Sequence, residues 1–173
     1  MSFIVPRVLI ISDNAGLAAQ VRAALAIPNS GSFEVQWVRQ LSAAIEYLGE
    51  KETSAFLLDL SLPDSNGTET FERLFAAAPD IPILILSADD QETLAAQAVG
   101  LGAHDYLLPK HLDRYSLPRA LRNAVERKFV EDALNMERER AIVTLNSIGD
   151  AVLCTDVSGK ITYLNLVAES MTG

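Results

Sequence analysis

Short apolar runs alternate along the chain with segments in which apolar residues recur every three or four positions. Five of these runs have the length of a strand: RVLII (7–11), FEVQWV (33–38), AFLLDL (55–60), PILILS (82–87) and HDYLL (104–108). Four segments between them have the spacing of amphipathic helices: residues 16–26, 40–50, 67–78 and 90–102. This alternation predicts an α/β fold, in which a parallel sheet is covered by helices on both faces.

A fifth helical segment is much longer than the others. Its core-facing stripe begins at Leu117, and beyond Val125 the pattern continues without glycine or proline as far as Gly149. A helix of roughly thirty residues exceeds the usual length of about a dozen and needs a partner to stabilise it. Its second half is highly charged, and its apolar residues thin to Val130, Leu134, Ala141, Leu145 and Ile148. We expect a parallel dimeric coiled coil; the alternative is a solvated linker.

The residues after Gly149 have the pattern of a β-hairpin. DAVLCTDVSGKITYLN contains two short strands separated by a turn at Asp156 to Gly159, and LVAESMTG then begins a helix. Because an isolated hairpin is marginally stable in water, we expect this segment to be the opening of a further domain.

The charge balance limits the choice of partners. The chain has 23 acidic and 14 basic residues, a net charge of -9, which repels nucleic-acid phosphates and anionic lipids. The single cysteine, Cys154, excludes an internal disulfide, and MSFIVPRVLII has neither a basic leader nor a long apolar segment. We therefore expect a cytoplasmic chain that binds neither nucleic acid nor membrane.

Polar residues stand where the predicted strands end. Ser12 and Asp13 follow the first strand, Asp59 closes the third, Ser87 the fourth, and Lys110 follows the fifth. The carboxyl ends of parallel strands meet at one edge of the sheet, where such folds bind their ligands. Each residue alone has an ordinary explanation, such as a helix cap or a solvated loop charge. Together they predict a shared site.

The chemistry that suits this set is phosphoryl transfer with Mg2+. A hard cation takes oxygen ligands, and the carboxylates of Asp13 and Asp59 fit that role. A phosphorylated carboxylate also needs a cation and a hydrogen-bond donor on its phosphoryl oxygens, which Lys110 and Ser87 would supply. Such a role explains why LLDLSLPDSNG (57–67) has an acid at the end of a buried strand.

Residues 7 to about 127 resemble the receiver domain of two-component response regulators, and LLDLSLPDSNG resembles the phosphoacceptor motif of that family. The resemblance implies a flavodoxin-like, doubly wound, five-stranded parallel sheet of order 2-1-3-4-5, here with an extended C-terminal helix. A sensor histidine kinase or a phosphotransfer protein would phosphorylate Asp59. Asp13 and the backbone carbonyl of Ser61 would join Asp59 on the magnesium ion.

The resemblance also assigns the groups around the phosphoryl oxygens. Ser87, the backbone amide of Ala88 and Lys110 would hold them. Tyr106 would be the aromatic switch that swings inward when Ser87 engages the phosphate.

Two positions depart from the family pattern. Ser12 stands where the first member of an acidic pair is usual, and Lys110 comes one residue late, behind Pro109. On a regular strand, a shift of one residue points the side chain to the opposite face. These departures motivate an alternative: a phosphorylation-incompetent pseudo-receiver that acts as a dimerisation module. A phosphohydrolase with Asp59 as nucleophile is disfavoured, because Ser61 stands where such enzymes usually have a second acid.

The C-terminal segment LNSIGDAVLCTDVSGKITYLNLVAESMTG resembles the beginning of a PAS sensory domain. The implied organisation is a receiver at 1–127, a helical linker at 128–146 and an incomplete PAS domain at 147–173. Chains of this kind often continue into domains that synthesise or hydrolyse cyclic-di-GMP, but the catalytic motifs of those domains do not occur here. We therefore expect no enzymatic activity beyond the phosphoryl transfer of the receiver itself.

Overall fold

The structure is a computed structural model that describes residues 5–26, 33–49, 52–87, 92–108, 110 and 112–172. The chain divides into two compact units, Met1–Lys128 and Phe129–Gly173. The boundary falls inside one continuous helix of 32 residues, α5 (Ser116–Ser147), which confirms the long helix predicted from the sequence.

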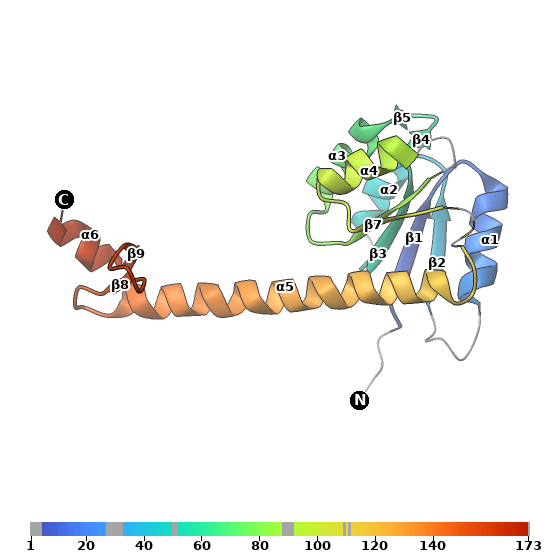
Figure 1. Cartoon of the computed structure of the whole chain (residues 1–173). Helices are drawn as coiled ribbons and strands as arrows, with labels where there is room; N and C mark the ends of the chain where they lie inside the picture. Colours follow the sequence, from blue (N-terminus) through green and yellow to red (C-terminus); the bar gives the residue numbers. More distant parts are fainter. Residues whose placement is uncertain are drawn as a thin grey trace. The chain divides into compact units, whose positions relative to one another are not determined.

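The first unit is built on a five-stranded parallel sheet of order β2-β1-β3-β6-β7 (Figure 1). Its strands are β1 (Arg7–Ile11), β2 (Glu34–Val38), β3 (Ala55–Asp59), β6 (Ile83–Leu86) and β7 (Asp105–Leu107). The predicted fold class and strand order are confirmed. Three strands, β1, β3 and β6, are almost completely buried, as expected of apolar strands covered on both faces.

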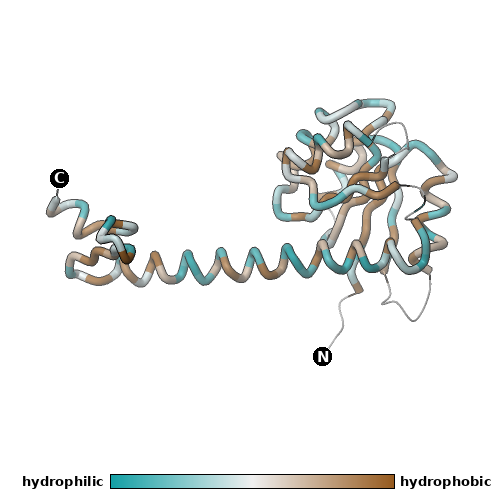
Figure 2. Tube along the Cα trace, viewed as in Figure 1, coloured by the Kyte–Doolittle hydropathy of each residue, from teal (hydrophilic) through white to brown (hydrophobic). Residues whose placement is uncertain are grey.

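Helices cover both faces of this sheet. On one face, α2 (Leu41–Leu48), α3 (Thr68–Ala77) and α4 (Glu92–Gly100) pack against side chains such as Phe56 and Ile85. On the other face, α1 (Ala15–Leu25) and the first turns of α5 pack against Leu57 and Leu84. Neighbouring strand residues therefore enter opposite cores. In Figure 2, the strands of the sheet are mostly coloured hydrophobic, whereas the second half of α5 mixes hydrophobic and hydrophilic colours.

One pair of strands was not predicted from the sequence. The two-residue strands β4 (Ser61–Leu62) and β5 (Ser65–Asn66) form a small antiparallel pair directly after β3. Gly67 closes this loop with φ 68° and ψ -151°, a backbone conformation that is essentially restricted to glycine.

The second unit contains the end of α5, an antiparallel hairpin of β8 (Leu153–Thr155) and β9 (Ile161–Leu164), and helix α6 (Leu166–Thr172). The predicted hairpin and the helix after it are confirmed. In the turn, the Asp156 carboxylate accepts hydrogen bonds from Ser158 and from the backbone N–H of Lys160. These bonds, the Ser158 hydroxyl first, lower the pKa of Asp156.

Asn165 is the polar centre of the second unit and is fully buried. Its amide nitrogen donates to the carbonyls of Leu145 and Asp150, at 3.0 and 2.9 Å. Its amide oxygen accepts from the N–H groups of Val152 and Ala168, both at 2.9 Å. One side chain therefore joins the end of α5 to the hairpin and to the first turn of α6.

None of the helices in the described part of the chain has both the length and the apolar composition that a membrane crossing requires.

Candidate functional site

The site predicted at the carboxyl edge of the sheet centres on Asp59, the last residue of β3. Its carboxylate is half-buried and is held through both oxygens. The hydroxyl of Ser12 donates to Oδ2 at 2.9 Å, and the backbone N–H of Ser61 donates to Oδ1 at 3.0 Å. Two donors from different segments therefore fix the orientation of this carboxylate.

Ser12 is fully buried and has a more specific role than its place in the sequence indicated. Its Oγ also accepts a hydrogen bond from the N–H of Asn14 at 3.1 Å, so its own proton is directed to Asp59. The backbone of Ser12 is held by β2, because its N–H donates to the carbonyl of Val38. Its carbonyl accepts a 2.7 Å hydrogen bond from the indole of Trp37. This indole contact could not be predicted from the sequence, because the two residues lie 25 positions apart along the chain.

The environment of Asp59 raises the pKa of its carboxyl group above the ordinary aspartate value. Burial is the main cause of a raised pKa, and the negative charge of Asp13 adds to it. The hydrogen bonds from Ser61 and Ser12 act in the opposite direction without cancelling the shift. A cation beside Asp59 and Asp13 would relieve both costs of ionisation, desolvation and repulsion.

Asp13 is exposed at the rim of the site. It is not the cap of α1, because the Asn14 side chain accepts the N–H groups of Gly16 and Leu17 and performs that role. Within the described residues, no hydrogen bond or ion pair engages the Asp13 carboxylate, so it can take a ligand.

The loop after Asp59 is held by contacts that the sequence did not reveal. The carbonyl of Leu60 accepts hydrogen bonds from the N–H of Gly67 at 2.8 Å and from the buried hydroxyl of Thr70 at 3.3 Å. The Asp64 carboxylate accepts the N–H groups of Leu41 and Ser42, both at 2.9 Å, and so caps α2.

Partial burial acts to raise the pKa of Asp64, but the N–H groups of Ser42 and Leu41 outweigh it, and the pKa is lowered overall. The loop that positions Ser61 is thus tied to the start of a neighbouring helix.

Ser87 and Tyr106 lie on the side of the crevice formed by β6 and β7. Ser87 directly follows β6, is buried, and donates its backbone N–H to the carbonyl of Leu107 at 3.0 Å. Tyr106 packs partly against the core, and its hydroxyl donates to Glu92 of α4 at 2.9 Å. The bond to Glu92 is the first cause of a raised pKa for Tyr106.

For two other predicted site residues, Lys110 and Ala88, the structure describes no hydrogen bond to Asp59. Lys110 is exposed, and among the described residues no hydrogen bond or ion pair links it to Asp59. Ala88, whose amide was predicted to assist, lies outside the described residues, as does Pro109. The structure therefore brings together Ser12, Asp59 and Ser61 by direct hydrogen bonds, and shows no such bond from Lys110 to Asp59 among the described residues.

Comparisons with known proteins agree with this geometry. The family model described as "Response regulator receiver domain" matches residues 8–122. The regulatory protein LuxO of Vibrio cholerae is 31% identical over 128 residues, which are 72% of this chain and 28% of LuxO. The "Probable diguanylate cyclase DgcE" of Escherichia coli is 52% identical over 48 residues, 28% of this chain and 4% of DgcE. The chain thus spans less than a third of either relative.

Solved structures show the same fold. The crystal structure of a response regulator receiver domain protein from Clostridium thermocellum superposes with a TM-score of 0.63 at 20% identity. The match covers 73% of this chain and 98% of that one. The sheet order, the acid at the end of β3 and the family match over most of the first unit lead to one assignment. The chain belongs to the response regulator receiver domain family.

Proposed function

We propose that the first unit is a phosphoacceptor receiver, in which Asp59 takes a phosphoryl group from a sensor histidine kinase or a phosphotransfer protein. The observation that carries the proposal is the orientation of the Asp59 carboxylate. It lies at the end of a central strand, with Ser12 on one oxygen and the Ser61 N–H on the other. A nucleophile held in this way needs little reorganisation before it reacts.

In the proposed step, an oxygen of the ionised Asp59 carboxylate attacks phosphorus. The bond between phosphorus and the donor's imidazole nitrogen breaks, and its electron pair returns to that nitrogen. The products are an acyl phosphate on Asp59 and a free histidine on the donor. Ser87, the Ala88 amide and Lys110 would hold the phosphoryl oxygens.

The donor set fits a magnesium ion. Asp13 and Asp59 supply carboxylate oxygens, and the backbone carbonyl of Ser61 would be a third ligand. Within the described residues, no group of three or more histidine, cysteine, aspartate or glutamate side chains could hold a metal. Mg2+ nevertheless accepts one or two carboxylates with water and phosphate completing its octahedron. When bound, it would neutralise negative charge on the phosphoryl oxygens.

We propose that Tyr106 is the switch residue and that the long helix carries its state onward. Turning Tyr106 inward toward Ser87 would require its hydroxyl to leave Glu92 of α4. The loss of this hydrogen bond would change how α4 and β7 pack. Since Leu107 of β7 packs in the same core as the first turns of α5, the change would then reach α5. By its sequence resemblance, the segment 147–173 would belong to a PAS domain, joined to the receiver at 1–127 by a helical linker at 128–146. The output would be cyclic-di-GMP synthesis or hydrolysis in a cytoplasmic protein; the relative DgcE is named a probable diguanylate cyclase.

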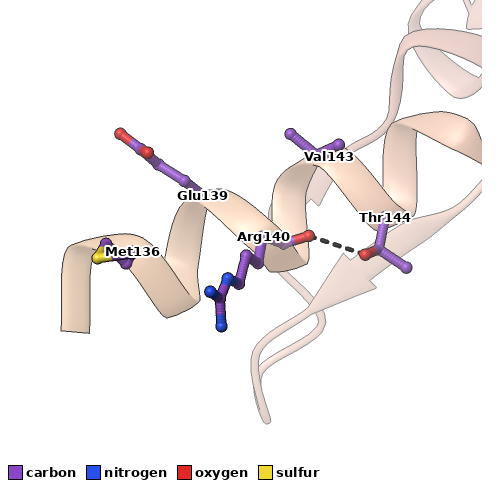
Figure 3. A pocket seen from close by; sticks show the side chains of 5 residues that line it. All are labelled: Met136, Glu139, Arg140, Val143 and Thr144. Carbon is purple, nitrogen blue, oxygen red and sulfur yellow. Dashed lines mark hydrogen bonds between the residues drawn. The ribbon is translucent and has the colours of Figure 1, made fainter. Parts of the chain in front are cut away.

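The second half of α5 supports a homodimer formed through this helix. Large apolar side chains along it are exposed, including Phe129 at 73%, Leu134 at 69% and Val143 at 68%. Figure 3 shows Met136 and Val143 lining a shallow pocket beside the charged side chains of Glu139 and Arg140. A parallel coiled coil with a second copy would cover such side chains, and neighbouring charges of both signs would pair across it.

A pseudo-receiver is the second candidate function. It is favoured by the hydroxyl of Ser12 in place of an acid, and by the lack of a hydrogen bond or ion pair between Lys110 and Asp59 among the described residues. Such a protein would keep the fold and the dimer but would not accept phosphate.

The two functions are distinguished by trapping. The chain is incubated with acetyl phosphate and Mg2+, reduced with borohydride, and digested for peptide mass spectrometry. The receiver predicts reduction of Asp59 to homoserine, which only an acyl phosphate undergoes. If Asp59 stays unmodified under conditions in which the phosphoacceptor aspartate of a known receiver is reduced to homoserine, the pseudo-receiver function is favoured.

A further inference from the structure

Two arginines stack on the chain's single tryptophan. The guanidinium carbon of Arg22, on α1, lies 5.7 Å from the ring centroid of Trp37, and that of Arg39 lies 4.9 Å from it. Both arginine residues are exposed. In the part of the chain that the structure describes, no carboxylate forms an ion pair with either of them.

This arrangement is unusual for a chain with a net charge of -9. Each guanidinium is attracted to the indole face, but the two positive charges repel each other. Helix α2 begins two residues after Arg39, and the Asp64 carboxylate caps it. This carboxylate already accepts the N–H groups of Leu41 and Ser42. The indole therefore holds two uncompensated positive charges together at the surface, each with N–H groups that can bind carboxylates in pairs.

The arginine pair also lies beside the phosphoacceptor crevice. Arg39 directly follows β2, at the same edge of the sheet as Asp59. The indole of Trp37 donates to the carbonyl of Ser12, and the hydroxyl of Ser12 donates to Asp59. A partner bound at the arginines would thus approach the carboxylate that is to be phosphorylated.

We propose that Arg22 and Arg39, held on Trp37, form a docking site for an acidic segment of the protein that donates the phosphoryl group. The identity of this partner rests on the proposed receiver function, whereas the affinity for acidic peptide does not. Paired guanidinium groups would bind carboxylates of the donor, and their field would speed its approach to a surface that is otherwise acidic.

The test uses the full chain and a polyglutamate peptide as the probe, with Trp37 as the fluorescent reporter. The expected result is a saturable change in Trp37 fluorescence. The apparent affinity should weaken by about tenfold as the salt concentration rises from about 0.05 M to about 0.5 M. An Arg22→Gln/Arg39→Gln variant should lose this response. An Arg138→Gln/Arg140→Gln variant, with the same change in net charge on α5, should keep it.

Three outcomes would overturn the proposal: no saturable response, an equal response in both double variants, or an equal response to inorganic phosphate, which would indicate a phosphate site. Labelling of Asp59 by acetyl phosphate separates this proposal from the receiver function. A small donor needs no docking surface, so the Arg22→Gln/Arg39→Gln variant should be labelled as fast as the parent. If acetyl phosphate does not label the parent chain at all, the proposed receiver function is wrong. The peptide titration would still show whether the two arginines bind an acidic peptide.

Discussion

Replacing Asp64 with alanine should destabilise the first unit, because this side chain ties the phosphoacceptor loop to helix α2. Its carboxylate accepts two 2.9 Å hydrogen bonds, from the N–H groups of Leu41 and Ser42. Loss of a helix N-cap costs about 0.5–2 kcal/mol, and a charged acceptor on two N–H groups belongs at the upper end of that range. We expect a loss of about 2 kcal/mol at pH 7, or a melting temperature lower by roughly 6–10 °C.

The pH dependence gives a second test of the same contact. Since the pKa of Asp64 is lowered in the folded state, its ionised form stabilises the fold at pH values above the ordinary aspartate pKa. This stabilisation is lost as the pH falls through the lowered pKa. The difference between parent and Asp64→Ala should therefore be full at pH 7 and should shrink in acid. Asp64→Asn, which keeps an acceptor oxygen without the charge, should fall between the two at pH 7.

The assay is urea denaturation followed by circular dichroism at several pH values. Asp80→Ala is the matched control, because the exposed Asp80 carboxylate makes only a 3.4 Å ion pair with Lys128 and should matter by less than about 0.5 kcal/mol. Asp64 would not stabilise α2 in this way if Asp64→Ala were no less stable than Asp80→Ala at pH 7, or if the stability deficit of Asp64→Ala grew as the pH fell.

Three other substitutions test the second unit, the loop after β3 and the contact between Tyr106 and α4. Asn165→Ala removes four side-chain hydrogen bonds from a buried position and should destabilise the second unit by about 3 kcal/mol or more. Amide hydrogen exchange at 153–164 should become faster, while exchange in β3 stays unchanged. Equal protection of 153–164 in the parent chain and the variant would contradict this prediction. Gly67→Ala should destabilise the first unit by about 1–3 kcal/mol in urea denaturation, because an alanine has room at this position but is strained at a positive φ. Gly100→Ala, in helix α4 with open space around it, should leave the stability unchanged or raise it. Similar stabilities of the two variants would be the contrary result. Glu92→Gln should lower the pKa of Tyr106 toward its ordinary value, because the hydrogen bond to the Glu92 carboxylate is the first cause of the raised pKa. The measurement is a spectrophotometric tyrosine titration. An unchanged titration curve would show that Glu92 does not bind the Tyr106 hydroxyl.

Much of the fold was predictable because the sheet is buried on both faces. Apolar runs such as RVLII mark the central strands directly, and β1 begins and ends where the run does. Several strands were predicted one or two residues too long, at the edge and in the centre of the sheet alike: HDYLL contributes only Asp105–Leu107, and PILILS only Ile83–Leu86. The β4–β5 pair escaped prediction because strands of two residues are too short to show a pattern.

The site was predictable only in part, for a different reason. Its candidate residues follow strand ends, which the sequence marks, but their hydrogen bonds join segments far apart in the chain. The bond from Ser12 to Asp59 spans 47 residues, and the cap of α2 by Asp64 reaches back over 23. The sequence identified Ser12 only as a missing acid, whereas the structure shows it as a buried donor to Asp59.

Asp59 is proposed to accept a phosphoryl group with the help of a divalent cation. The most direct measurement is the intact mass of the chain after incubation with acetyl phosphate and Mg2+, beside an Asp59→Asn variant and a sample without the metal. We predict one phosphoryl adduct on the parent chain, none on Asp59→Asn and little without Mg2+. An unmodified parent chain, or an adduct that survives the loss of Asp59, would contradict the claim.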